Sequence, residues 1–220
     1  MKTRDLLLSE SYPIWEKIYH QPFVTELGSG TLPIDKFIYF LQQDHAYLID
    51  FARVLCLAAA KAEDIHTLQL FIRHAIGGIE AELAFHKNAA ETLGVPLDTL
   101  EGAERAPVTV AYTRHLLAVG REGTLGEIVA SLLPCYWIYG EVGRRLAKNP
   151  PDKEPYKSWI EGYASDEYWA LVDEMQSLVD RLGPLSSKSE QLKMLGHFRT
   201  SSKYEFYFWD QAYQQSKWIV

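Results

Sequence analysis

Three side chains that can do chemistry, Asp44, Cys135 and Glu205, each fall inside an apolar stripe of a predicted helix. Residues three or four positions apart share one face of a helix, so Tyr47 should lie beside Asp44 and Tyr139 beside Cys135. Glu205 stands within the run KYEFYFW, an unusually aromatic setting for a carboxylate. Because a thiol is a nucleophile and a carboxyl group an acid or base, this set could perform nucleophilic catalysis with proton transfer.

Each of these residues also has a purely structural interpretation. Burying a carboxylate costs roughly several kcal/mol unless it is paired or protonated, and one bonded to a Tyr hydroxyl can simply hold a core together. A buried cysteine is more often a small apolar side chain than a nucleophile. Pro134 strains the helix that carries Cys135, which predicts either a tolerated kink or a distortion beside a reactive thiol. The presence of all three features in one chain, with several Tyr hydroxyls, favours chemistry.

The elements that must position these side chains are all predicted to be helices, because apolar residues recur at helical spacing and no long stretch alternates with period two. Thr124 and Glu127 match a capping box, while Asp64 and Ser165 can cap two further helices. The pattern predicts about eight helices, over residues 3–20, 31–62, 65–94, 107–120, 124–148, 157–164, 166–182 and 189–215. No linker or repeat divides the chain. We therefore predict an all-α fold, a single helical bundle forming one domain over residues 1–220.

Charge and hydropathy narrow the classes of partner. The formal net charge is −7, and no run of basic residues is longer than the pair Arg144 and Arg145. Nucleic-acid-binding proteins carry a basic surface, so we expect no nucleic-acid partner. Nowhere do enough uncharged apolar residues run together to span a membrane, and the leucines near the start are too few for a signal peptide. We expect no membrane partner and a cytoplasmic location.

The two cysteines need separate explanations, because neither CxxC spacing nor a disulfide framework is present. Cys56 lies between Leu55 and Leu57 and precedes three alanines. This setting predicts close helix packing and a thiol that reacts only after unfolding. Cys135, in contrast, is expected to face a pocket and to be alkylated in the folded protein.

The segment LLPCYWIYGEVG, residues 132–143, resembles the signature helix of the TenA family, also called thiaminase II. The resemblance continues in collinear order along nearly the whole chain. It includes PFV at 22–24, GTLP at 30–33, QD at 43–44, EAE at 80–82 with His86, YE at 204–205 and FW at 208–209. The segment around Cys135 is highly specific, and the shorter motifs are persuasive together.

The resemblance implies a heme-oxygenase-like bundle that forms a homotetramer and serves thiamin salvage without a cofactor or metal. Such enzymes hydrolyse thiamin, or its breakdown product 5-aminomethyl-4-amino-2-methylpyrimidine, to the hydroxymethylpyrimidine. By resemblance, Cys135 adds to an electron-poor ring carbon and Glu205 protonates a ring nitrogen and moves protons to the leaving group. Asp44 then binds the exocyclic amine and the adjacent ring nitrogen. The tyrosines that match pocket-lining positions of the family are Tyr47, Tyr112, Tyr139 and Tyr163.

Two other classes of function stay open. The pairs Glu16/His20 and Glu82/His86 have i, i+4 spacing that could bind iron on the same bundle, although the paired Glu-x-x-His motifs of di-iron bundles are not found. Surface pairing or a satisfied core histidine is the favoured interpretation of both. The chain could also be a non-catalytic regulator that acts through other proteins. Metal analysis and a turnover assay with the aminopyrimidine separate these classes from the enzyme.

Overall fold

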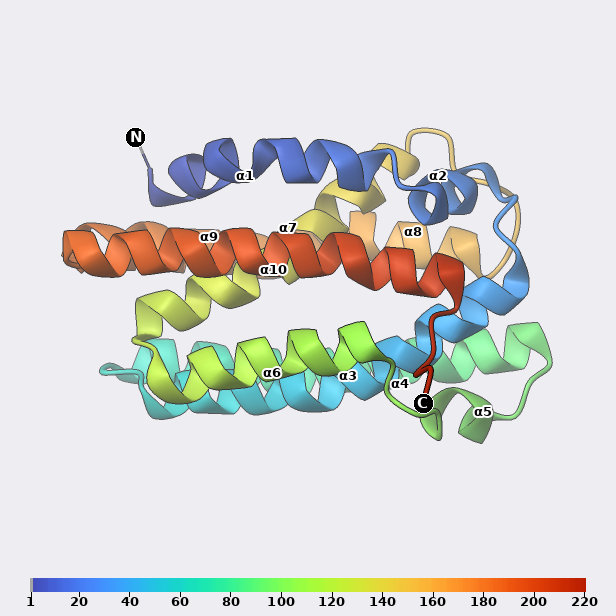
Figure 1. Ribbon diagram of the computed structural model, residues 1–220, viewed down its shortest axis with the longest axis horizontal. Coiled ribbons are helices and arrows are strands. Elements are labelled where there is room, and N and C mark those ends of the chain that lie inside the picture. Colours follow the sequence, from blue (N-terminus) through green and yellow to red (C-terminus); the bar gives the residue numbers. More distant parts are fainter. Residues whose placement is uncertain (1) are drawn as a thin grey trace.

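The computed structural model describes residues 2–220, and these residues form ten α-helices and no strand (Figure 1). The longer helices are α1 (Thr3–Tyr19), α3 (Ile34–Ala60), α4 (Ile65–Leu93), α6 (Pro107–Glu122), α7 (Leu125–Leu146), α9 (Asp166–Leu182) and α10 (Lys188–Gln214). The shorter ones are α2 (Pro22–Ser29), α5 (Leu97–Glu101) and α8 (Tyr156–Ala164), and a 3₁₀ turn covers Gly183–Leu185. The predicted all-α fold is confirmed.

All eight predicted helices are present, and the expected caps explain where several begin. The Asp64 side chain accepts hydrogen bonds from the first amides of α4, and the Ser165 hydroxyl accepts one from the Tyr168 amide at 3.1 Å. The helices α2 and α5 were not predicted. With eight and five residues, they are too short for an apolar period to repeat. Helix α2 ends at Gly30, whose φ of 73° is a conformation that favours glycine.

Helix α7 crosses the middle of the molecule between two groups of helices. In Figure 1 it rises diagonally behind α10, with α3, α4 and α6 below it and α1 above its lower half. It packs against α10, α8, α9, α6 and α3. Residues on every side of α7 are buried, including Pro134 near its centre. A helix that is apolar all round is a core helix, so side chains on α7 face every neighbouring helix.

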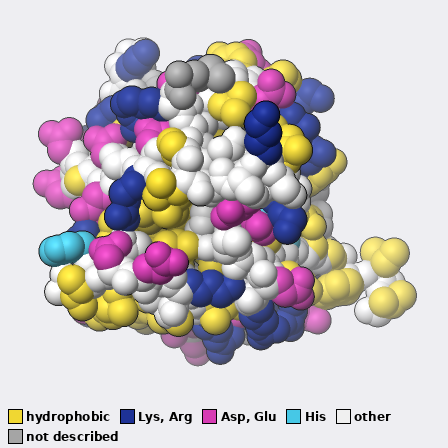
Figure 2. Space-filling view, turned by 90° about the vertical axis from the view of Figure 1, so that its left-hand side faces the viewer, with side chains coloured by type: hydrophobic (Ala, Val, Ile, Leu, Met, Phe, Trp, Pro, Cys, Tyr) yellow, Lys and Arg dark blue, Asp and Glu magenta, His cyan; other side chains and the backbone are white. Residues whose placement is uncertain are grey.

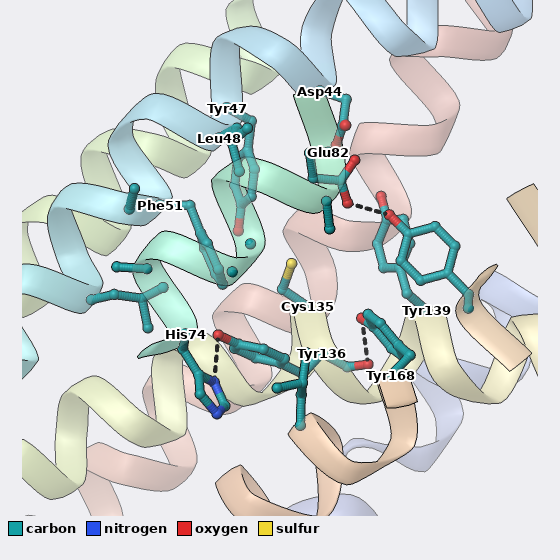
Figure 3. A pocket seen from close by; sticks show the side chains of 18 of the residues that line it. Asp44, Tyr47, Leu48, Phe51, His74, Glu82, Cys135, Tyr136, Tyr139 and Tyr168 are labelled. Atoms are coloured by element: carbon teal, nitrogen blue, oxygen red, sulfur yellow. Dashed lines mark hydrogen bonds between the residues drawn. The ribbon is translucent and has the colours of Figure 1, made fainter. Parts of the chain in front are cut away.

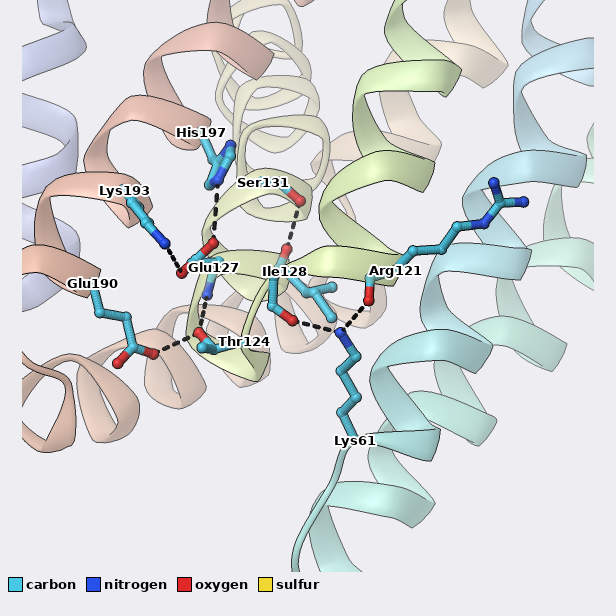
Figure 4. Close-up of polar contacts among 10 residues, drawn as sticks. Lys61, Arg121, Thr124, Glu127, Ile128, Ser131, Glu190, Lys193 and His197 are labelled. Atoms are coloured by element: carbon cyan, nitrogen blue, oxygen red, sulfur yellow. Dashed lines mark hydrogen bonds and ion pairs between the residues drawn. The ribbon is translucent and has the colours of Figure 1, made fainter.

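The start of α7 is fixed by polar contacts from distant parts of the chain (Figure 4). The Thr124 hydroxyl accepts from the Glu127 amide at 3.3 Å, which is one half of the predicted capping box. The Glu127 carboxylate, however, turns to Lys193 Nζ at 3.7 Å and His197 Nε2 at 3.4 Å, both on α10. These ion pairs tie the first turn of α7 to α10 in place of the second half of the box.

The surface is mixed in charge at the end of the bundle shown in Figure 2. Acidic and basic side chains alternate there with apolar ones, and no large patch of a single sign covers this face. Across residues 2–220, no helix combines the length and the apolar character that a membrane span requires.

Candidate active site

All seven residues that the sequence singled out as candidates line one cavity between the two groups of helices. They are Asp44 and Tyr47 of α3, Tyr112 of α6, Cys135 and Tyr139 of α7, Tyr163 of α8, and Glu205 of α10. Figure 3 shows the Cys135 sulfur pointing into this cavity, with Tyr47 and Glu82 facing it from α3 and α4. Side chains separated by up to 161 positions in the chain, Asp44 and Glu205, are thus brought to the same chamber.

Glu205 is a deeply buried carboxyl group with one strong partner. Only 1% of the residue is exposed, and the Tyr112 hydroxyl donates to its Oε1 atom at 2.6 Å. The Tyr112 ring is stacked on Tyr204 with ring centroids 5.1 Å apart, which holds the hydroxyl in place. Burial raises the pKa of Glu205 to about 8, although the hydrogen bond from Tyr112 opposes the shift. The carboxyl group therefore carries a proton at neutral pH.

The Cys135 thiol is close to this acid and is partly shielded from water. Burial, followed by the nearby Glu205 carboxylate, raises the pKa of the Cys135 thiol well above its usual range. The resting thiol is therefore protonated, and it becomes a nucleophile only when a neighbour takes its proton. Beside it, the buried Tyr47 hydroxyl faces the thiol, a contact that opposes part of this rise in the Cys135 pKa, and it has no other hydrogen-bond partner among the described residues. An unpaired buried hydroxyl in a cavity is a group available to a polar ligand.

A second acidic group lies on the opposite wall of the cavity. The His86 Nε2 atom is 3.2 Å from Asp44 Oδ2, and the Tyr163 hydroxyl donates to Glu82 Oε1 at 3.1 Å. Burial, together with the charge of Asp44, raises the pKa of Glu82 to about 8. Although burial opposes the change, the hydrogen bond and charge of Asp44 raise the pKa of His86. The result is an Asp44–His86 pair beside a protonated Glu82.

The same three residues are the place where a metal ion could be held. Asp44, Glu82 and His86 each offer one ligand atom within 4.8 Å of the others, and no other group of this kind occurs within residues 2–220. A cation there would have to replace the existing hydrogen bond between Asp44 and His86. The other pair with iron-binding spacing is a surface feature: His20 bonds the Glu16 backbone carbonyl at 2.8 Å, and the Glu16 carboxylate accepts from Tyr12.

Several cavity residues were not among the sequence candidates. In the sequence, Glu82 is marked only by the EAE motif and by its i, i+4 spacing to His86. Tyr136 follows Cys135, and its hydroxyl lies 3.1 Å from His74 Nδ1, whose other ring nitrogen is 2.7 Å from Glu174 Oε2. Further members of the cavity wall are Phe51, Tyr168 and Phe208. The aromatic run at 204–209 could have indicated Phe208, but no local pattern marks a residue on another helix as a neighbour.

The predicted packing of Cys56 is wrong. This cysteine is exposed on α3 and lines a different cavity, with Ile49 of the same helix and Leu83 of α4. Consecutive alanines indicate that one side of a helix packs closely, but they do not place the preceding cysteine on that side. Ala58 and Ala59 are buried, while Cys56 lies on the other side of α3. Cys135 is in the cavity, as predicted.

Comparison with known proteins places this bundle among characterised relatives. The TENA/THI-4/PQQC family model matches residues 8–215. The aminopyrimidine aminohydrolase of Bacillus subtilis (strain 168) is 38% identical over 218 residues, which cover 99% of this chain and 92% of the relative. A solved structure described as a TenA family transcription regulator from Silicibacter sp. TM1040 is 30% identical, with a TM-score of 0.89 and coverage of 96% of each chain.

A more distant likeness establishes the architecture. The structure of heme oxygenase 2 from Chlamydomonas reinhardtii is 14% identical, has a TM-score of 0.65 and covers 96% of this chain and 97% of its own. At that identity the likeness concerns the fold alone. The predicted heme-oxygenase-like bundle is confirmed.

Proposed function

Because this chain belongs to the TENA/THI-4/PQQC family, we propose that it is a hydrolase of thiamin salvage that converts an aminopyrimidine to 4-amino-5-hydroxymethyl-2-methylpyrimidine. The substrate is thiamin or 5-aminomethyl-4-amino-2-methylpyrimidine. The observation that carries the proposal is the meeting of a thiol, Cys135, with a buried and protonated acid, Glu205, in one aromatic cavity. The name of the Bacillus subtilis relative supports the same chemistry.

In this proposal the cavity binds the pyrimidine by its polar edge and its faces. Asp44 accepts from the exocyclic amine and engages the adjacent ring nitrogen, because a carboxyl group can pair with both at once. Its pairing with His86 at 3.2 Å keeps the carboxylate oriented. The rings of Tyr139 and Tyr163, with centroids 5.0 Å apart, offer an aromatic wall for stacking. The unpaired Tyr47 hydroxyl supplies one more polar contact.

The first chemical step is nucleophilic addition. The Cys135 S–H bond breaks, its proton passes through the Glu205 carboxyl group to a ring nitrogen, and the sulfur forms a bond to an electron-poor ring carbon. A neutral pyrimidine is a poor electrophile, so the attack requires this protonation. A Glu205 pKa of about 8 suits the task, since an acid whose pKa lies near the working pH both holds and releases a proton.

The second half of the reaction exchanges the leaving group for water. Electrons from the exocyclic amine expel the leaving group from the methylene carbon, and the side-arm nitrogen of the aminopyrimidine takes up one proton and departs as ammonia. Water then adds its hydroxyl group to that carbon and gives up its other proton in exchange. The S–C bond breaks, and the proton on the ring nitrogen returns to the thiol through Glu205. The net change is the replacement of the C–N bond of the side arm by a C–O bond.

The competing interpretation, a regulator without catalysis, does not account for the content of the cavity. A regulator gains nothing from burying Glu205 and Cys135 together, and an acid buried with a single hydrogen-bond partner, Tyr112, lowers stability. The decisive experiment incubates purified protein with each substrate and follows the hydroxymethylpyrimidine by chromatography. We expect turnover on at least one substrate and its loss in Cys135→Ser. No turnover on either one would contradict the proposed enzyme.

We also propose that the enzyme assembles as a homotetramer. The support is an exposed apolar row on α4, at the spacing of a helix interface: Ile72, Ile76, Ile79 and Leu83 are each between 37% and 54% exposed. Light scattering after size-exclusion chromatography should give four times the 25.2 kDa chain mass. Ile76→Glu should lower that mass, whereas Leu192→Glu, at a more exposed apolar position on α10, should not. A monomeric wild-type protein would disprove the assembly.

A further inference from the structure

Glu82 occupies the junction between the cavity that holds Cys135 and a second, outer cavity. The outer cavity lies between α4, α8 and α9 and includes Ser158 and Glu167. The residues that line both cavities are Gly77, Ala81, Glu82, Tyr163, Tyr168 and Leu171. Among them Glu82 is the one carboxyl group. A part of a ligand that extends from the inner chamber into the outer cavity therefore passes this side chain.

The surroundings of Glu82 keep its carboxyl group protonated and close to the proposed substrate. Its oxygen lies within 4.8 Å of ligand atoms of both Asp44 and His86, and Tyr163 donates to it at 3.1 Å. In Figure 3 the Asp44 and Glu82 carboxyl groups lie on the same side of the Cys135 sulfur. Desolvation in the cavity, followed by the nearby Asp44 carboxylate, favours the neutral form of Glu82, whose pKa is raised to about 8. The mechanism described above gives this acid no task.

The shape of the proposed substrate brings its reacting arm to this acid. The exocyclic amine and the aminomethyl arm are attached to adjacent carbons of the pyrimidine ring. When Asp44 holds the amine and the ring nitrogen next to it, the arm extends from the other side of the amine, one ring position away. Glu82 is the carboxyl group within 4.8 Å of Asp44, and it also faces the outer cavity into which the arm can extend. Glu205, to which the family resemblance also gives the proton of the leaving group, lies on helix α10 and engages the ring nitrogen in the proposed addition.

We propose that Glu82 is a catalytic residue that binds the leaving nitrogen of the side arm and supplies its proton, an inference that rests on the proposed hydrolysis. As the C–N bond breaks, its electron pair goes to the nitrogen, the Glu82 proton completes the departing ammonia, and Glu82 is left as a carboxylate. Water then adds its oxygen to the methylene carbon and gives one proton to Glu82. The acid is restored, and one water is consumed for each ammonia released.

The two candidate substrates differ in their need for this proton. The aminomethyl arm must depart as ammonia, because an amide anion is far too basic a leaving group. The thiazolium of thiamin departs as a neutral thiazole and needs no proton at all. A residue that protonates the leaving group should therefore matter for one substrate and not for the other. A residue that only supports the cavity wall should affect both to the same degree.

The test uses Glu82→Gln, which keeps the shape and the contact with Tyr163 but has no acidic proton. Enzyme in excess is mixed with each substrate for a single turnover, and ammonia and thiazole are measured as they are released. We expect ammonia release to slow by about 100-fold or more, while thiazole release stays within about threefold of the wild type. The matched control is Glu80→Gln, two residues away on the exposed side of α4, which should change neither release.

The possible outcomes separate the role of Glu82 from the proposed hydrolysis. Equal slowing of both releases, or slowing of neither, overturns the role of Glu82 while the proposed hydrolysis stands. If the wild type releases neither product, the proposed function fails and this inference fails with it. If it cleaves thiamin alone, Glu82 has no nitrogen to protonate and the inference is wrong. If it cleaves the aminopyrimidine alone, the ¹⁵N isotope effect on ammonia release must increase in Glu82→Gln, and an unchanged value overturns the role.

Discussion

The cavity holds two carboxyl groups that keep their protons at neutral pH and one that is paired with a histidine. Glu205 is buried and Glu82 is half-buried, and the pKa of each is raised to about 8. Asp44 instead faces His86 at 3.2 Å. The surroundings of each carboxyl group, rather than its residue type, determine whether it holds a proton or pairs with a neighbour. One pocket can therefore offer a substrate acids at two places and a hydrogen-bond acceptor at a third.

The Glu205→Gln variant should lose turnover by roughly 10²- to 10⁴-fold, the usual contribution of an acid or base. Glutamine can still accept the Tyr112 hydrogen bond, so affinity for the hydroxymethylpyrimidine should change by no more than a few-fold. The measurement is kcat by product chromatography together with calorimetric binding of the product. Near-normal kcat would remove Glu205 from the mechanism.

The pH dependence offers an independent check on the same residue. Since the Glu205 acid loses its proton above about pH 8, wild-type kcat should fall as pH rises through that value. The Tyr112 hydrogen bond lowers the pKa of Glu205. Tyr112→Phe should therefore move the alkaline limb of the kcat profile to higher pH. A limb that stays in place, or moves to lower pH, would show that Glu205 does not set it.

The two cysteines should respond differently to an alkylating reagent in the presence of ligand. Cys135 lies in the cavity with a raised thiol pKa, so iodoacetamide should modify it slowly, with loss of activity, and the pyrimidine product should slow the reaction further. Cys56 lines a separate cavity, so its labelling should not depend on that ligand. Peptide mass spectrometry measures both at once. Full activity in Cys135→Ser, or labelling of Cys135 that the product does not slow, would contradict the nucleophile.

At the scale of elements, two glycines of α7 allow neighbouring helices to come close enough to form the cavity. A Cβ atom on Gly143 would lie 2.7 Å from the backbone carbon of Tyr163, and one on Gly140 would lie 3.1 Å from the ring of Trp169. Helix α8 carries Tyr163, whose hydroxyl bonds Glu82 on α4. The close packing of α7 and α8 therefore decides whether Tyr163 can reach the acid on the far wall.

Gly143→Ala should destabilise the protein by roughly 1–3 kcal/mol and raise KM, because α8 must move away from α7 and Tyr163 moves with it. Gly162→Ala is the matched control: it lies in α8 with nothing within 4 Å of the added carbon. Because alanine has a higher helix propensity than glycine, this substitution should leave stability unchanged or raise it by up to about 1 kcal/mol. Chemical denaturation and steady-state kinetics measure both. Equal effects of the two substitutions would show that the close approach is unimportant.

At the scale of the whole molecule, the buried acids tie stability to pH. The pKa of Glu205 is 4.5 in the unfolded reference and about 8 in the folded chain. Between these values the folded state holds a proton that the unfolded state has released, so its contribution to stability is complete below about pH 4.5 and is lost as pH rises through about 8. Each such group can contribute a slope of roughly 1.4 kcal/mol per pH unit.

The Glu205→Gln variant should therefore be more stable than the wild type at pH 8 and about equal to it at pH 5. Glutamine mimics the protonated acid at every pH, so the variant loses the slope that Glu205 contributes. Melting temperatures at the two pH values measure the difference. A variant that is destabilised equally at both would show that Glu205 is structural, whereas stabilisation with loss of activity is the expected cost of a functional site.

Much of the fold could be predicted because the residues that begin and end a helix lie close together in the sequence. The caps at Asp64, Thr124 and Ser165 and the breaks near Gly94 and Gly183 mark helix ends within a few neighbouring residues. The two short helices left too little pattern to detect. Cytoplasmic location, one domain over 1–220 and tetramer assembly stay predictions, since nothing in the folded chain tests them.

The sequence by itself determined the helices, the aromatic setting of Glu205 and the candidate nucleophile, because each depends on residues a few positions apart. Only the tertiary structure decided which side chains meet. Glu82 is 38 positions from Asp44 and 81 from Tyr163, yet it contacts the latter and lies within 4.8 Å of the former. Helical period fixes the face on which a side chain lies, but not the helix that it faces. Burial, the proton on each acid and the exposure of Cys56 follow from that packing, and so they could not be read before the helices were assembled.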